Sequence, residues 1–390
     1  MDFAIGWNRF NLSVLGVWPE PREVSKLWRW TSSFIFWSST IITFAFVCTP
    51  LTVKLLVSLT SLDEIIENLS INVPITFALI KQIVLRYHGK ALKFLLSQIH
   101  EDWCKTTSDW ERQTMMKNAK LSRQISIVCS TLAYIMLSAF ISFQIWSHMQ
   151  MNPGQSYHGF LHSGLFPYDV QKSPNYEISW FGQFIGTSLM AICYSCFDTF
   201  LAVLVLHLRG QLTVLRLTLE NLYNATKEQN FKDFDAKLGF IVHRHWQLSN
   251  FAVTVENCFN VTLLVQTLIN FCFELRVEFC AIWQELINGF IFYLGLTFFV
   301  THVIYTMLHL FIYCYIGEQL LGEVTDSAYD CNWYDMPPKK AVLLVIVICR
   351  ARTPLLITAG KFSAFSFELF NGVLKTSAGY LSVLLAMKDT

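Results

Sequence analysis

Very few side chains in this chain of 390 residues have types and spacing that could carry chemistry. His302 and His309 are seven residues apart, so on a helix they would share one face, where two imidazoles could begin a metal site. No Cys, Asp or Glu stands at ligand spacing beside them, and we predict that both histidines are packing residues. Paired carboxylates for acid and base catalysis are also missing from the apolar segments. We therefore expect no enzyme, no cofactor and no metal.

Asp198 is the only acid in the apolar segment 180–206. A charge within an apolar membrane segment costs at least ~2.5 kcal/mol on insertion scales, so this carboxylate needs a partner or water. An ion site is one interpretation. A structural salt bridge or hydrogen-bond anchor is the interpretation that we prefer.

The composition indicates what surrounds these residues. Hydrophobic residues make up 53% of the chain and charged residues only 15%, and the mean hydropathy is +0.41. A soluble globular surface could not carry this composition, so a lipid bilayer is implied. The formal net charge of +1 leaves no basic excess for nucleic acid, and that class of partner is excluded.

Several segments reach the ~20 mostly apolar residues that a membrane-spanning helix needs. The segments 30–50, 125–146 and 286–316 carry no Asp, Glu, Lys or Arg, whereas 180–206 and 251–273 carry one acid each. The segment 70–85 is shorter and carries Lys81, but it lies between polar segments and is needed for the chain to return across the bilayer. The last span, 362–387, follows a shorter apolar run with a break at Pro354 and Gly360. We predict an all-α, seven-span bundle in a single domain, 1–390, with a broken seventh helix and a cytosolic anchor segment over 318–360.

Orientation follows from the basic residues in the connections, because cytoplasmic loops are enriched in Lys and Arg. With the N-terminus in the cytosol, the inner connections, counted as far as Lys340, hold twenty basic residues and the outer ones four. The chain is therefore predicted to have a cytosolic N-terminus and an extracellular C-terminus. The sequon Asn68-Leu69-Ser70 then lies on the outer side, where glycosylation of Asn68 is a prediction.

The last sixty residues resemble the C-terminal signature of insect odorant receptors. The resemblance is carried by Ala328, Tyr329 and Trp333, by Pro354, by the run Thr358-Ala359-Gly360-Lys361, and by Lys375, Thr376, Ser377 and Tyr380 in the final helix. It implies a ligand-gated cation channel, a tetramer around a central pore, in which an odorant-specific subunit joins a shared co-receptor. The connection 207–250 has no room for the long insertion of the co-receptor, so this chain resembles the odorant-specific kind. The family's location is the plasma membrane of a sensory neuron dendrite.

In the final helix, residues of mostly small size share one face at steps of three and four. Small residues permit close helix approach, so this face could pack against other spans of the same subunit. The family resemblance favours a pore lining instead, with Val383 at the position of a hydrophobic gate. The pore residues predicted in this way are Gly379, Val383 and Ala386. The predicted contacts to other subunits are Tyr329, Trp333 and Tyr334.

A pocket for a small, neutral, apolar odorant is expected between the spans in the outer half of the membrane, walled by apolar and aromatic side chains with a few hydroxyls. Each candidate residue, taken singly, is as well explained by helix packing. The candidates, chosen by helical spacing, are Phe77 on the second span, Tyr134, Leu137 and Ile141 on the third, Phe184 and Ser188 on the fourth, and Tyr293, Thr297 and Thr301 on the sixth.

Three other classes of membrane protein remain as alternatives. A gustatory-type channel shares the architecture, but its usual Thr-Tyr-aliphatic-Gln-Phe ending is missing here. A metabotropic seven-helix receptor would have the reverse orientation and Asp-Arg-Tyr and Asn-Pro-x-x-Tyr motifs, which this sequence lacks. A membrane enzyme or transporter is disfavoured because the sequence has no paired intramembrane carboxylates and no internal repeat.

Overall fold

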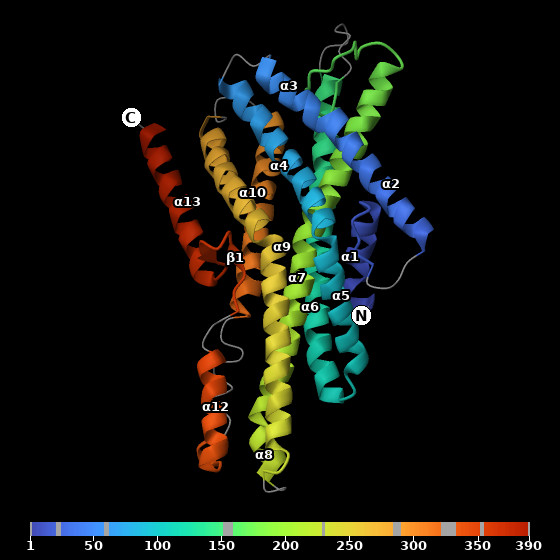
Figure 1. Ribbon diagram of the computed structural model, residues 1–390. Coiled ribbons are helices and arrows are strands. Elements are labelled where there is room, and N and C mark those ends of the chain that lie inside the picture. The colour runs from blue at the N-terminus through green and yellow to red at the C-terminus, as the bar shows by residue number, and fades with distance from the viewer. Residues whose placement is uncertain are drawn as a thin grey trace.

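The structure, a computed structural model, describes residues 2–20, 25–57, 62–150, 159–227, 231–283, 290–320, 333–351 and 355–388, and nearly all of them are helical. Long helices run side by side along one axis (Figure 1). The helices are α1 (Asp2–Val14), α2 (Lys26–Thr43), α3 (Thr49–Val57), α4 (Leu62–Tyr87), α5 (Gly89–Lys105), α6 (Asp109–Gln150), α7 (Asn175–Glu220), α8 (Leu222–Lys227), α9 (Phe234–Trp283), α10 (Phe290–Glu318), α12 (Pro338–Ala351) and α13 (Phe367–Lys388).

The predicted all-α bundle is confirmed, and the described part of each predicted span is helical apart from residues 362–366, which precede α13. The span 30–50 corresponds to α2 and α3, joined by the π-helical turn η1 (Phe44–Cys48), and the other six correspond to α4, α6, α7, α9, α10 and α13. Among the described residues, four stretches are long and apolar enough to cross a membrane by length and composition, namely Lys26–Val57, Asp109–Ile145, Asn175–Glu220 and Phe234–Asn270.

Three helices are longer than a bilayer requires. The helices α6, α7 and α9 have 42, 46 and 50 residues, and at 1.5 Å per residue each exceeds the ~30 Å of a hydrocarbon core about twofold. Their excess lies at the end of the bundle where α5, α8 and α12 are found (Figure 1). We call this the basic end, because the connections that are rich in Lys and Arg lie there.

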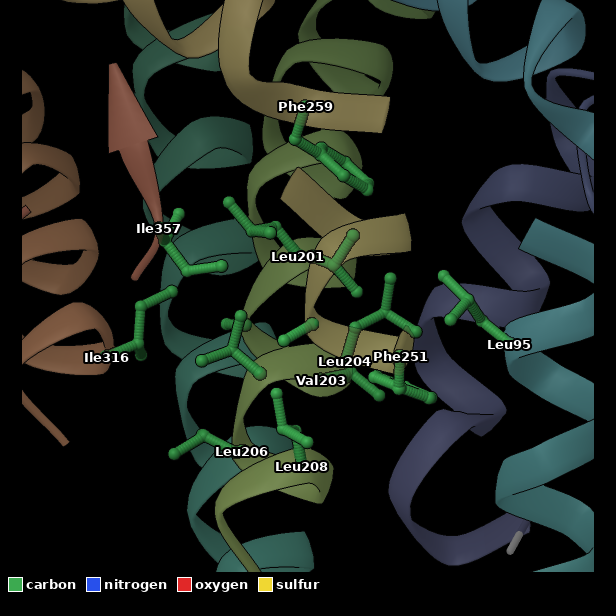
Figure 2. Packing of buried hydrophobic residues seen from close by; sticks show 14 of the residues in the cluster. Leu95, Leu201, Val203, Leu204, Leu206, Leu208, Phe251, Phe259, Ile316 and Ile357 are labelled. Atoms are coloured by element: carbon green, nitrogen blue, oxygen red, sulfur yellow. The ribbon is translucent and has the colours of Figure 1, made fainter. Parts of the chain in front are cut away.

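Helix α7 is the centre of the bundle. Every residue from Ser195 to Leu206 is buried, so this helix has no lipid-facing or water-facing side over that stretch. Figure 2 shows Leu201 and Leu204 of α7 near Phe251 and Phe259 of α9, with Ile316 and Ile357 on the opposite side. Helices α1, α2, α4, α6, α9 and α10 all contact α7.

Helix α1 was not predicted from the sequence, and it packs against both α6 and α7. Asn8 is fully buried, and its Nδ2 donates a hydrogen bond of 2.9 Å to Ser126 Oγ while its Oδ1 accepts one of 2.7 Å from Thr199. Gly16, at a φ of +66°, turns the chain after α1, where a Cβ would collide with the backbone of Ser32. The first residues of the chain are therefore part of the folded bundle.

The last helix is broken, as predicted. The segments α12 and α13 are separated by a two-stranded antiparallel hairpin, β1 (Thr358–Ala359) and β2 (Ser363–Ala364), in which Thr358 pairs with Ala364. Gly360 forms the turn at a φ of +60° and its N–H donates to the Asn260 carbonyl of α9. The Thr358 N–H donates to Glu256 Oε2 at 2.9 Å, so the hairpin is fastened to α9. Pro354, the other predicted breaker, lies outside the described residues.

Candidate ligand-binding site

A cavity of about 230 Å³ lies between five helices in the half of the bundle away from the basic end. Its volume is below the ~300–1,000 Å³ of pockets for drug-sized molecules, so it suits a smaller compound. The described lining residues are Ile71, Pro74, Ile75 and Ala78 of α4, Ala133, Met136, Leu137 and Phe140 of α6, His162 of the loop before α7, Thr187, Met190, Ala191 and Tyr194 of α7, Ile269 and Asn270 of α9, and Tyr305 and Thr306 of α10.

Small residues and a proline in the lining helices explain why the cavity is not filled by side chains. Ala78, Ala133 and Ala191 place a single methyl group where three facing helices approach the cavity. Pro74 lies inside α4 and has no N–H, so the helix lacks one hydrogen bond there and can bend locally. Small side chains and a proline on facing helices therefore leave a void that larger residues would have filled.

The loop residue His162 is held in the cavity wall by contacts with α6 and α7. The Gln183 side chain accepts a hydrogen bond from the His162 N–H at 3.2 Å and donates one to the His162 carbonyl at 3.0 Å. The His162 Nε2 lies 2.8 Å from the Thr187 hydroxyl, and its ring stacks on Phe140 with centroids 5.4 Å apart. Burial lowers the pKa of His162 to about 4, so the imidazole is neutral at physiological pH.

The loop around His162 is itself anchored to α3, at the end of the first span. The Leu165 N–H donates to the Pro50 carbonyl at 2.9 Å, and Lys54 Nζ donates to Ser163 Oγ at 2.9 Å. Gly164 lies so close to Pro50 that a Cβ would collide with the proline ring. The position of His162 is thus determined by tertiary contacts on both sides of the loop.

A buried ion pair lies next to the cavity. Lys81 Nζ of α4 is 2.8 Å from Asp198 Oδ1 of α7, and the two side chains are 0% and 3% exposed. Gln266 of α9 donates to Asp198 Oδ2 at 3.1 Å, and the Lys81 Nζ lies 3.8 Å from the ring centre of Tyr194, a cavity residue. The salt-bridge interpretation of Asp198 is confirmed.

His309 of α10 belongs to the same polar cluster. Its Nε2 lies 3.7 Å from Asp198 Oδ2, and its Nδ1 lies 2.9 Å from the Tyr305 carbonyl. Within the described residues, no group of three or more His, Cys, Asp and Glu could hold a metal ion. The side chain of His302 lies outside the described part of the structure.

One of the nine predicted ligand-binding residues, Leu137, lines the cavity. The Tyr134 hydroxyl instead donates to Asn11 of α1 at 3.1 Å, and Phe77 is buried with its ring 5.4 Å from Lys81 Nζ. Phe184 stacks on Trp180 outside the lining. Ile141, Ser188 and Thr301 are also absent from the lining, and the side chains of Tyr293 and Thr297 lie outside the described part of the structure.

The predicted ligand-binding residues lie on four of the five helices that line the cavity, and none of them lies on α9 or in the loop. The lining positions on α6 and α7 follow helical spacing, with steps of three, one and three from Ala133 to Phe140 and from Thr187 to Tyr194. The sequence shows this spacing, but apart from Leu137 the residues that we predicted on these two helices are not in the lining. No sequence signal placed His162 at the cavity.

The predicted pore and interface residues are only partly described. Gly379 of α13 is exposed, and a Cβ built there meets nothing within 4 Å. The side chains of Val383 and Ala386 lie outside the described part, as do Tyr329 and the side chain of Trp333. Tyr334, in the short 3₁₀ turn η3 (Trp333–Asp335), is 66% exposed.

The predicted glycosylation residue Asn68 lies inside α4 and is 6% exposed. Its Nδ2, the atom that would carry the sugar, donates a hydrogen bond of 3.2 Å to the Leu51 carbonyl. A glycan needs an accessible amide nitrogen, so the geometry of the folded chain disfavours this modification.

A bundle of membrane-length helices around a small, mostly apolar cavity with a few inward polar groups defines a multi-pass membrane receptor for small molecules. The family model described as 7tm Odorant receptor matches residues 61–378 of the chain. The chain therefore belongs to the insect odorant receptor family, as the C-terminal residues indicated.

Individual relatives agree with this assignment. The chain is similar to Odorant receptor 13a of Drosophila melanogaster, with 24% identity that covers 96% of this chain and 93% of the relative. It is also 27% identical to the Odorant receptor coreceptor of Harpegnathos saltator over 38% of this chain and 30% of that protein. The structure of the olfactory receptor OR5 of Machilis hrabei in complex with eugenol has the same fold, with a TM-score of 0.82, 13% identity, and coverage of 99% of this chain and 100% of that one.

Proposed function

We propose that this chain is the odorant-specific subunit of a ligand-gated cation channel in which a small, neutral, largely apolar volatile binds the cavity. The observation that carries the proposal is the cavity itself, which five helices and an anchored loop form around mainly apolar side chains. Burial of apolar surface stabilises such a complex by ~25 cal/mol per Å². The described lining carries no Asp, Glu, Lys or Arg, so an ionised ligand would find no counter-charge in direct contact.

The pore is proposed to be lined by α13. Gly372 and Gly379 lie seven residues apart on one face of this helix, and a Cβ at either position would meet open space among the described residues. The glycines leave room on this face of α13, so a helix of another subunit can approach it closely. Val383, one turn beyond Gly379, is the proposed gate, where a ring of apolar side chains closes a narrow pore by excluding water.

A surface at the basic end supports assembly with other subunits. Trp246 and Phe240 of α9 are exposed, and so are Val342, Val345 and Ile346 of α12. We call these five residues the α9–α12 patch. Lys340 of α12 forms an ion pair of 2.6 Å with Asp235 of α9, so the two helices lie together there. Contiguous exposed apolar side chains outside the membrane indicate a protein interface.

The partner that we propose is the odorant co-receptor, in a hetero-oligomeric, tetrameric channel. Similarity to co-receptors of several insects supports a shared mode of assembly. Tyr329, Trp333 and Tyr334 are proposed to contribute to the same contact, because they precede α12. The proposed location is the plasma membrane of a sensory neuron dendrite, with membrane lipid around the bundle.

The test is current recorded from cells that express this chain together with a co-receptor, exposed to a panel of neutral volatiles. Ala133→Trp fills the cavity and should abolish the response, whereas Ala139→Trp, on the exposed side of the same helix, should keep it. Surface labelling of both variants verifies that they reach the membrane. Equal responses of the two variants, or full responses by the chain without a co-receptor, would contradict the proposal.

A further inference from the structure

His162, one of the residues that line the cavity, has a ring nitrogen without a hydrogen-bond partner among the described residues. The His162 side chain is 2% exposed, and its Nδ1 has no hydrogen-bond partner among the described residues. A buried imidazole nitrogen without a partner loses the hydrogen bond that it makes with water in the unfolded chain, which costs free energy. Natural folds satisfy most such groups, so this one invites an explanation.

The neighbours of the ring hold it in one position. Gln183 binds both the N–H and the carbonyl of His162, Phe140 stacks on the ring face, and Thr187 bonds to Nε2. None of these three side chains carries a charge. The imidazole is therefore positioned by four contacts, while Nδ1 takes part in none of them.

The hydrogen-bond network also favours one of the two ring nitrogens as the site of the proton. Among the described residues the Thr187 hydroxyl bonds only to His162 Nε2, at 2.8 Å. If Nε2 were the donor, the hydroxyl hydrogen would have no acceptor and the Nδ1 lone pair would also be unused. If the Thr187 hydroxyl instead donates to Nε2, its hydrogen has an acceptor. The hydrogen on Nδ1 is then the one polar hydrogen of these two side chains without an acceptor. The neutral ring is then protonated at Nδ1, which makes that atom a donor.

We propose that the Nδ1–H of His162 is the group that selects among ligands of this cavity, and that it selects neutral compounds with an acceptor oxygen, such as ketones, aldehydes and esters. This inference rests on the proposed function and names the ligand class of the same site. A site with a buried donor discriminates against an analogue that lacks the acceptor, because the donor then stays without a partner. The rest of the ligand is held by the apolar walls.

The experiment uses matched pairs of volatiles on cells that express the chain with a co-receptor. Each carbonyl compound is tested beside the hydrocarbon of the same skeleton, as in acetophenone and ethylbenzene, or cyclohexyl methyl ketone and ethylcyclohexane. On the unmodified chain we expect the carbonyl compound of an active pair to be more potent by about tenfold or more. His162→Phe should bring this ratio close to one, without a loss of potency for the hydrocarbon.

Two further variants make the outcome decisive. Ala139→Val, on the exposed side of α6 and outside the cavity lining, should leave the ratio unchanged, while Thr187→Val removes the hydroxyl that fixes the proton on Nδ1 and should reduce the ratio. Equal potency within pairs on the unmodified chain, or a His162→Phe channel at the cell surface that keeps the carbonyl preference, would overturn the inference. A panel that evokes no current at all would contradict the proposed function, and the inference with it.

Discussion

At the scale of single residues, the ion pair between Lys81 and Asp198 is a charged contact buried in the bundle interior. Both side chains are almost fully buried, and the pair joins α4 to α7, with Gln266 of α9 as a third partner. A buried pair is costly to form, but the removal of one partner leaves an uncompensated charge, which is more costly still. The pair therefore favours the packing of α4, α7 and α9 that keeps both charges together.

Lys81→Met should destabilise the receptor by about 3–5 kcal/mol, because Asp198 would remain buried without its cation. The melting temperature of the purified complex in detergent measures the effect. The double variant Lys81→Met, Asp198→Asn should be less destabilised than Lys81→Met alone. The matched control is Lys105→Met, since Lys105 pairs with Glu101 at the surface and its loss should cost less than about 1 kcal/mol. Similar losses in both lysine variants would refute this account.

His162 gives a prediction for the pH dependence of stability. Its pKa is about 4 in the folded chain and about 6.5 when unfolded, so the unfolded state binds the proton more tightly. The neutral His162 ring makes its full contribution to the free energy of unfolding above pH ~6.5. This contribution is lost as the pH falls from there toward ~4. The expected loss is about 3 kcal/mol at most. Melting temperatures measured between pH 7 and pH 5 should decline more steeply for the unmodified chain than for His162→Phe, and parallel declines would contradict the assignment.

Individual partners were beyond the reach of the sequence. Asp198 was expected to have a counter-charge or a hydrogen bond, because the cost of a lone charge in an apolar segment demands one. That the cation is Lys81, 117 positions away along the chain, depends on the way α4 packs on α7. The same holds for His162, whose place at the cavity depends on bonds to Gln183 and to the Pro50 region.

At the scale of elements, the hairpin between α12 and α13 positions the last helix. The Gly360 turn has a positive φ, which costs a residue with a Cβ roughly 1–2 kcal/mol, and a Cβ there would also collide with the Leu264 side chain. Gly360→Ala should therefore destabilise the hairpin by about 2 kcal/mol or more and reduce ligand-evoked current at equal surface expression.

The control for this variant is Gly89→Ala, at the first position of α5, where a Cβ meets nothing within 4 Å. This change should leave current and surface expression unaltered. Current and surface expression together separate a displaced α13 from a general folding defect. A Gly360→Ala channel with normal current would show that the hairpin does not position the last helix.

Apolar length predicted the spanning elements well, and polar burial explains the element that was missed. Each span was visible because about twenty apolar residues in a row have few alternatives to crossing a bilayer. Helix α1 is short and carries Asn8 and Asn11 on its buried side, which bond to Ser126, Thr199 and Tyr134. A hydropathy pattern does not reveal polar residues that face the interior of a bundle. The sequence therefore predicted only a cytosolic N-terminus for this segment.

At the scale of the whole molecule, the α9–α12 patch makes a prediction about assembly. Trp246 and Ile346 are 62% and 61% exposed at the basic end, and Trp246 precedes the segment of α9 that is predicted to span the membrane, 251–273. Ile346→Asp should weaken co-purification with a co-receptor by at least about tenfold, because a charge in the core of an apolar interface is desolvated without a partner.

Tyr87→Glu, at an exposed site on the end of α4, is the control and should leave co-purification unchanged. The melting temperature of each isolated subunit should stay within about 1 °C of the unmodified chain, which separates a lost interface from a lost fold. If the Ile346→Asp variant still co-purifies with the co-receptor, the interface lies on another face of the molecule.

The unbroken course of α7 has a mechanical consequence. The helix runs from the cavity wall at Ala191 to Leu219 near the basic end without an interruption, a distance of roughly 42 Å at 1.5 Å per residue. A rod of that length acts as a lever. When a bound molecule tilts it by about two degrees at the cavity, its far end swings by roughly 1.5 Å, which is enough to change the fit of a side chain in a tightly packed contact.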